Sequence, residues 1–408
     1  MNQDLATKII ESLRAGIPTR DSTCNLISAS SPLHERFAGD LNQLARSQGI
    51  PKGRLIWGQF GQGKTHELTS LEHRAIDRGF AVSRITINRQ LSGQRLEHLY
   101  TKLAASIRTP NSNLFGIRHV LDKKMLKDLP DTKIQNPDRY THPLPAIILE
   151  TYFGADSEYQ EILYNALLGS PVSLSDLKRI YKSCFGRSFP KFPERFAPTK
   201  HSKSYFELMA DILKWCGYHG WVILIDEIEL IHRLPKLGRM QAYQNLNWLL
   251  NWSGSQTFPI YTVGSVTDSL ISLWLTPQGQ SKLPDTDLIP ALARERGDAE
   301  SEQAMKRFFE YAQDNELCPF IERMSENALG DLLIEITKIH GISYGWESAI
   351  DISSVIKSQG SSPVRIHIRA LIETLDMSYL GDQNFVPQLT PLEESIMSED
   401  ESYFNESS

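Results

Sequence analysis

The chain has 408 residues, of which 40% are apolar and 23% charged, with a formal net charge of −6. This composition can bury a sizeable core in one large domain with additions, or in two to three smaller ones. No apolar run approaches the roughly 18 residues that span a bilayer, and the first residues lack a signal-peptide core, so we expect a cytoplasmic protein with no membrane contact.

The net charge belongs to the C-terminal end of the chain. Six acids and no Lys or Arg lie in the last sixteen residues, so the body is neutral overall, and we expect a disordered acidic tail over 381–408. The cysteines are scattered and form no Cys-x-x-Cys pair, which favours reduced thiols over a zinc site or disulfides. They are Cys24, Cys184, Cys216 and Cys318.

Two helices are expected in an N-terminal segment at 1–50. The first carries Ile9, Ile10 and Leu13, and the second follows Ser31-Pro32 with apolar residues spaced to face one way. We expect both to lie against the α/β domain that follows.

A glycine-rich turn after the apolar run at 55–57 is typical of a phosphate-binding loop. Residues 58–65 fit Gly-x4-Gly-Lys-Thr and lead into a helical pattern. Glycines let backbone N–H groups turn toward an anion, and the helix start adds its positive dipole end. The alternative is a chance glycine turn. The predicted ATP-binding residues are Gly58, Gln59, Phe60, Gly61, Gln62, Gly63, Lys64, Thr65 and His66.

Two of these residues have sharper expected roles. Lys64 is predicted to contact the β and γ phosphates as a catalytic cation, and the Thr65 hydroxyl is predicted to hold Mg²⁺. The stretch 81–87 then alternates like a strand, so strand, helix and strand predict a parallel βαβ unit. We assign 51–290 to an ATPase core.

A helical insertion is expected within this core at about 96–205. Its tract from Lys178 to Lys203 holds eight Lys or Arg residues and one acid, Glu194, interleaved with five aromatic residues. Basic and stacking residues together suit single-stranded nucleic acid, here DNA. The favoured alternative is that the aromatic residues anchor an irregular loop while the charges face solvent.

Five apolar residues at 221–225 end in two carboxylates, which predicts a buried parallel strand with its ligand edge at Asp226. Asp226 is expected to support Mg²⁺, and Glu227 to act as the catalytic base that polarises the attacking water. Glu229 is the second candidate base, and two acids capping the next helix are the structural alternative.

A further strand is expected at 258–265, and it would lie between the phosphate-loop strand and the acidic strand if the strand order is that of additional-strand P-loop ATPases. Thr262 or Ser265 could then sense the γ phosphate, or simply cap a turn. Beyond it, residues 291–380 are expected to form a helical lid.

Arginines in the C-terminal half are candidates for phosphate contacts because guanidinium stays charged and presents a planar fork. Arg365 is the predicted catalytic arginine, near a helix start with Ser362 as cap, and Arg369 lies one turn later. For Arg239, Arg294 and Arg296 we favour a surface position.

Several motifs together resemble the ATP-binding proteins of BREX bacteriophage-defence systems, a branch of the AAA+ class. The resemblance covers most of residues 5–380. It rests on the stretches 9–18 (IIESLRAGIP), 57–66 (WGQFGQGKTH), 79–84 (GFAVSR), 217–221 (GYHGW) and 226–229 (DEIE), and on Arg239 with 242–246 (AYQNL).

This resemblance implies an α/β AAA+ fold with a central parallel sheet, ATP binding, and work with other defence proteins such as a helicase. Two functions follow from the motifs: a Mg²⁺-dependent ATPase that remodels or loads a partner on DNA, or a low-turnover switch or scaffold that recruits a partner. The sequence leaves open whether the chain forms a homo-oligomer in which a neighbour's arginine completes the site.

Overall fold

The computed structural model describes residues 1–15, 19, 26, 32–124, 139–192, 194–277, 283–322, 324–348, 350–360, 362–382, 385 and 387. Contacts divide the chain into two units. The sheet unit comprises the described residues of Ser30–Gln59 and Glu67–Ile321, and the helical unit those of Met1–Ala29, Phe60–His66 and Glu322–Ser408. Cys24, Gly16, Pro18 and nearly all of the predicted tail lie outside the described residues.

A four-stranded parallel sheet forms the centre of the sheet unit, in the order β1-β4-β3-β2. The strands are β1 (Arg54–Gly58), β2 (Ala81–Thr86), β3 (Trp221–Asp226) and β4 (Ile260–Thr267). The α/β fold with a central parallel sheet is therefore confirmed. β4 does lie between β1 and β3, so the condition placed on the expected strand order is met.

An extended segment runs along the free edge of β1. The N–H groups of Leu55 and Trp57 donate to the carbonyls of Leu317 and Pro319, both at 2.9 Å, and Trp57 pairs with Phe320 in parallel. Residues 317–321 thus cover the backbone edge that β1 would otherwise expose.

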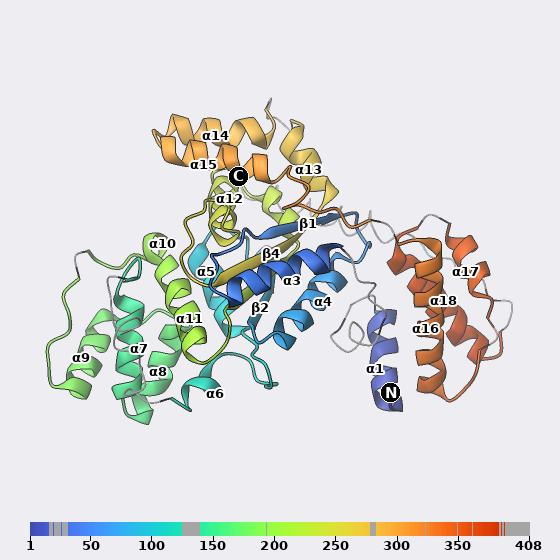
Figure 1. The fold of residues 1–408 in the computed structure, drawn as a ribbon, viewed down its shortest axis with the longest axis horizontal. Helices are drawn as coiled ribbons and strands as arrows, with labels where there is room; N and C mark the ends of the chain where they lie inside the picture. The colour runs from blue at the N-terminus through green and yellow to red at the C-terminus, as the bar shows by residue number, and fades with distance from the viewer. Residues whose placement is uncertain are drawn as a thin grey trace, which may run out of the picture. The chain divides into compact units, whose positions relative to one another are not determined.

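Helices cover both faces of this sheet, as a parallel sheet requires. On one face, α3 (Pro32–Ala45) and α4 (Lys64–Asp77) pack against the sheet in Figure 1. Their contacts with it come from Leu33, Phe37, Leu41, Leu68, Leu71 and Ala75, which meet Ile56, Val82, Leu224 and Val263 of the strands. The alternation of each strand sends its other side chains into a larger core on the opposite face.

The predicted helical insertion lies between β2 and β3. Its helices are α5 (Leu96–Ala105), α6 (Arg118–Leu121), α7 (Leu144–Gly154), α8 (Ser157–Leu167), α9 (Leu174–Phe185), α10 (Pro198–His201) and α11 (Lys203–Trp215). After β3 come the 3-10 helix η3 (Ile228–Arg233), α12 (Lys236–Leu249), α13 (Asp268–Leu275), α14 (Asp285–Glu295) and α15 (Ala299–Tyr311). Helices α14 and α15 pack on each other and on α12, so they belong to the sheet unit although the predicted lid begins at residue 291.

The helical unit contains α1 (Gln3–Arg14), α16 (Glu326–Tyr344), α17 (Ile352–Gln359) and α18 (Val364–Tyr379). The apolar face of α1, including Ile9, Ile10 and Leu13, is buried with residues of α16 and α18. The expectation that α1 lies against the α/β domain is therefore wrong, whereas α3 does pack there. The amphipathic pattern of α1 requires a partner but does not identify it.

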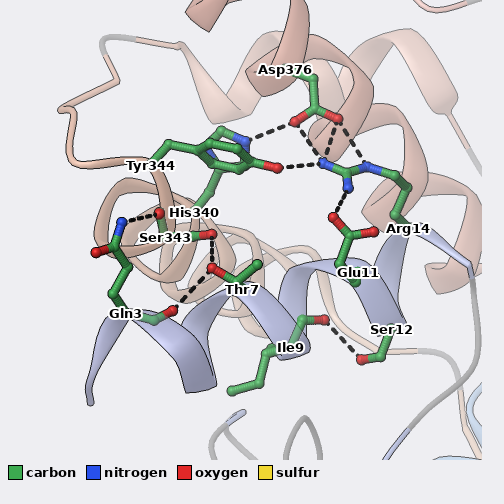
Figure 2. A network of polar contacts seen from close by, with 10 residues as sticks. All are labelled: Gln3, Thr7, Ile9, Glu11, Ser12, Arg14, His340, Ser343, Tyr344 and Asp376. Atoms are coloured by element: carbon green, nitrogen blue, oxygen red, sulfur yellow. Dashed lines mark hydrogen bonds and ion pairs between the residues drawn. The ribbon is translucent and has the colours of Figure 1, made fainter.

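Polar contacts also attach α1 to α16 and α18. Figure 2 shows Arg14 reaching Asp376 of α18 through Nε and Nη2, at 3.1 and 2.9 Å, and donating to the Tyr344 hydroxyl at 3.0 Å. His340 Nε2 donates to the same carboxylate at 3.0 Å, because Trp346 Nε1–H donates to His340 Nδ1 at 3.0 Å. Burial lowers the pKa of His340, which suits this neutral form.

We expect Asp376→Ala to weaken the attachment of α1 by about 1–2 kcal/mol, because it removes the carboxylate of α18 that both Arg14 and His340 contact. Hydrogen exchange of residues 3–14 should become faster by roughly tenfold. Glu11→Gln is the matched control, since the exposed Glu11 contacts the same guanidinium and should change exchange little. Equal exchange in Asp376→Ala and the wild type would contradict this role of Asp376.

Candidate nucleotide-binding site

The predicted phosphate loop directly follows β1, and α4 begins at Lys64. Gly61 and Gly63 have φ angles of +77° and +98°, in the region that glycine adopts without strain. A Cβ on Gly61 would lie 2.9 Å from Pro363, so this position has no room for a side chain. Lys64 is buried and Phe60 is 53% exposed. This backbone fits a loop that turns its N–H groups toward an anion.

Arg365 lies beside this loop within the helical unit. Its guanidinium carbon is 5.9 Å from the centre of the Phe60 ring. The arginine is the second residue of α18, and the N-cap is Pro363 with no side-chain hydrogen bond, so the expected Ser362 cap is wrong. Arg369, one turn later, is 3.9 Å from Glu373.

Asp226, the last residue of β3, and Glu227, which follows it, lie in different environments. Asp226 is 4% exposed, while Glu227 is exposed and has a left-handed backbone with φ 57° and ψ 40°. The Glu227 N–H points back to Asp226 Oδ1 at 3.2 Å and to Ser265 Oγ at 3.4 Å. The turn thus buries one carboxylate and sends the next residue outward.

Strand register separates the two candidate sensor residues. Ser265 Oγ donates to Asp226 Oδ1 from the neighbouring strand. Thr262 pairs with Ile223 in mid-strand, and its buried hydroxyl has no hydrogen-bond partner. The polar residue that ends β4 is Thr267, which is buried and pairs with Gly58. The sequence prediction missed it because that prediction ended the strand two residues early.

Arg84 also contacts Asp226, although the sequence motifs do not indicate a role for it at the site. From β2, its Nη2 donates to Asp226 Oδ2 at 2.9 Å and its Nη1 donates to Thr69 Oγ1 at 2.6 Å. The available signal was a charged residue inside an alternating apolar strand.

Two of the three other candidate arginines pair with carboxylates. Arg239 is not a surface charge, because its side chain is only 15% exposed and pairs with Asp285 at 2.9 Å. Tyr243 also donates to Asp285, at 2.9 Å. Arg294 is exposed, as expected, and pairs with Glu302. Arg296 is exposed.

The aromatic residues of the Lys178–Lys203 tract pack into the protein. Tyr181 is 1% exposed, and none of the five is fully exposed. Phe189 contacts Tyr181 and Phe192 edge-on, and Phe196 packs against His201. These rings anchor the loop, in agreement with the favoured alternative, and are not a platform for stacking bases.

The basic side chains of the tract are mostly on the surface. Lys203 is the exception, since it lies 5.4 Å from the Trp248 ring centre and burial lowers its pKa. Arg179, Arg187 and Lys200 pair with acids. Among the described residues, four exposed cations have no acidic partner within 4.0 Å: Lys178, Lys182, Lys191 and Arg195.

The donor set fits a magnesium ion held mainly by phosphates and water. Within the described ranges, no three His, Cys, Asp or Glu residues gather as a metal cluster. A threonine hydroxyl at the start of α4 and one carboxylate at the end of β3 are the oxygen ligands that Mg²⁺ takes beside a nucleotide.

Among the described helices, none combines the length and the apolar character that a membrane span requires.

Comparison with protein families identifies the chain. Residues 1–139 and 199–268 match the family described as BREX system ATP-binding protein BrxC/D. The chain belongs to this family. The resemblance seen in its motifs to the BREX ATP-binding proteins is thereby confirmed, and the protein is an ATP-binding protein of a phage-defence system. The matched residues include the phosphate loop and the acidic pair but not Arg365.

No curated protein matches the chain. Among solved structures, the Orc1 protein of Aeropyrum pernix in complex with DNA is similar at 13% identity with a TM-score of 0.33. The similarity covers 95% of this chain and 66% of that chain.

Two hydroxyls of β4, those of Ser265 and Thr262, give a matched test of the site. Ser265→Ala should lower the free energy of unfolding by about 1–3 kcal/mol, because a buried carboxylate oxygen loses a donor. Thr262→Val removes a buried hydroxyl without a partner, so stability should stay equal or rise by about 1 kcal/mol. Denaturant unfolding measures both, and equal losses would contradict the assignment of Ser265 to Asp226.

Proposed function

We propose that the protein is a Mg²⁺-dependent ATPase that couples hydrolysis to the remodelling or loading of a partner on DNA during phage defence. The observation that carries this proposal is the turn at the end of β3, where Asp226 is buried and Glu227 projects outward from a left-handed backbone. The phosphate-loop motif begins at the end of β1, which runs parallel to the neighbouring strand β4, as β3 does.

Each residue has a defined task in this proposal. Mg²⁺, when bound with ATP, would neutralise phosphate charge. Lys64 and the loop backbone bind the phosphates, Thr65 and Asp226 hold the metal, and Glu227 accepts a proton from the attacking water.

Arg365 is proposed as a catalytic arginine because it already lies beside Phe60 of the loop. Its fork of donors suits the charge that develops on a transferring phosphoryl group. An arginine from a second copy in a homo-oligomer is the alternative source of that charge.

The competing function is an ATP-dependent switch or scaffold with little turnover, which recruits a partner such as a helicase. It needs ATP binding but has no use for a carboxylate presented to water. The exposure of Glu227 beside a buried Asp226 therefore supports the hydrolase.

Two substitutions separate binding from hydrolysis. Lys64→Ala should lower ATP affinity by at least about tenfold, since it removes a cation from the phosphates. Glu227→Gln should keep ATP affinity and reduce phosphate release by roughly 100-fold or more. Calorimetry measures the first and a phosphate-release assay the second.

Glu229→Gln is the matched control, because Glu229 is the other candidate base and should retain most activity. ATP binding without phosphate release above background in the wild type would sink the hydrolase proposal and favour the switch. Equal losses in Glu227→Gln and Glu229→Gln would contradict the assignment of the base.

A DNA contact is proposed through the exposed cations of α9 and the loop after it, without base stacking. Four unpaired cations suit the phosphate backbone, whose contacts carry no sequence information. Reversing Lys182, Lys191 and Arg195 to Glu should weaken DNA binding by at least about tenfold at low salt.

In the wild type, affinity should fall steeply as salt rises, which fluorescence anisotropy with a labelled oligonucleotide measures. Arg179→Glu, Arg187→Glu and Lys200→Glu together make the matched control, since these cations are already paired. Salt-independent binding, or equal loss in both triple variants, would contradict the proposed surface.

A further inference from the structure

The Asp226 carboxylate is held from both neighbouring strands. On the β4 side, Ser265 Oγ and the Glu227 N–H engage Oδ1. On the β2 side, the Arg84 guanidinium engages Oδ2 at 2.9 Å. The side chains of Asp226 and Arg84 are 6% and 22% exposed, so this ion pair is largely shielded from water.

The register explains how Arg84 reaches Asp226. Arg84 pairs with Leu224, two residues before Asp226, so the two side chains are diagonal neighbours on the face that α4 covers. A diagonal separation of this kind is within the reach of a long side chain.

The same guanidinium also contacts α4. Its second terminal nitrogen donates to Thr69 Oγ1 at 2.6 Å, and Thr69 is 1% exposed. Thr69 lies one helical turn after Thr65 on α4. Arg84 therefore ties the strand end that carries Asp226 to the helix that carries Thr65.

Only an arginine can make both contacts at once. Its donors leave a rigid planar group in different directions, whereas a lysine ammonium is a single point of charge. Residues that orient a metal ligand commonly affect metal affinity even though they never touch the metal.

We propose that Arg84 is a positioning residue that fixes Asp226 relative to α4 and thereby sets the magnesium dependence of ATP binding. This inference rests on the proposed Mg²⁺–ATP site. Arg84 acts through Asp226 and Thr69 and makes no contact of its own with the nucleotide.

The test is calorimetric titration of the full chain with a non-hydrolysable ATP analogue, once with Mg²⁺ and once with EDTA. Arg84→Gln should lower affinity by about tenfold or more in Mg²⁺ and leave affinity in EDTA within about twofold of the wild type. Arg84→Lys and Thr69→Val each remove one of these two contacts. Each should therefore lower the affinity for the analogue about threefold in Mg²⁺ and leave the affinity in EDTA unchanged.

Arg179→Gln is the control, since it removes an exposed arginine whose ion pair lies within α9, and both affinities should be unchanged. If Arg84→Gln lost affinity for the analogue equally in Mg²⁺ and in EDTA, the inference would be overturned. Unchanged affinity of Arg84→Gln in both conditions would also overturn it. If Arg84→Gln does not fold, Arg84→Lys and Thr69→Val decide the matter by the same comparison. Absence of analogue binding in the wild type would instead overturn the proposed function beneath it.

Discussion

Four parallel strands bring their carboxyl ends to one edge of the sheet, and this constraint governs every group that reaches Asp226. Because β3 lies between β4 and β2, its last carboxylate can accept hydrogen bonds from both sides. Ser265 supplies one side and Arg84 the other. The long insertion enters between β2 and β3 without interrupting the ladder between them. The insertion therefore leaves this edge of the sheet continuous.

The local motifs were predictable from sequence because each one carries its own physical signature. The loop at 58–65 needs glycines at fixed places, and Gly61 and Gly63 do have positive φ angles. The acidic strand needs an uninterrupted apolar run, and Trp221–Asp226 is fully buried. These signals lie within a few residues of one another, so no knowledge of the tertiary fold is required to find them.

Contacts between distant residues could not be found in this way. Arg84 and Asp226 are separated by 142 residues, and only the strand register makes them neighbours. Similarly, Thr262 and Ser265 looked equivalent in sequence, but alternation turns them to opposite faces of β4. The attachment of α1 to α16 and α18 belongs to the same class. The amphipathic pattern of α1 predicts that one face is buried. Whether that face packs in the sheet unit or in the helical unit depends on distant partners such as Asp376.

Composition was least informative in the Lys178–Lys203 tract. Aromatic and basic residues alternate there, but Tyr181 and its neighbours pack inward while most of the cations face solvent. A loop without regular structure needs apolar anchors, and aromatic rings bury much surface per residue. The same composition therefore serves a loop anchor as readily as a base-stacking groove, and only burial distinguishes the two.

The backbone of Glu227 bears most directly on whether ATP is hydrolysed or merely bound. A left-handed conformation costs a residue with a Cβ about 1–2 kcal/mol relative to the right-handed one, and glycine or asparagine would adopt it more cheaply. Here the conformation is maintained by the hydrogen-bonding of its N–H toward Asp226 and Ser265. Glycine at this position would remove that cost but would also remove the side chain. The exposed glutamate in this conformation therefore supports the proposed role of Glu227 as the base.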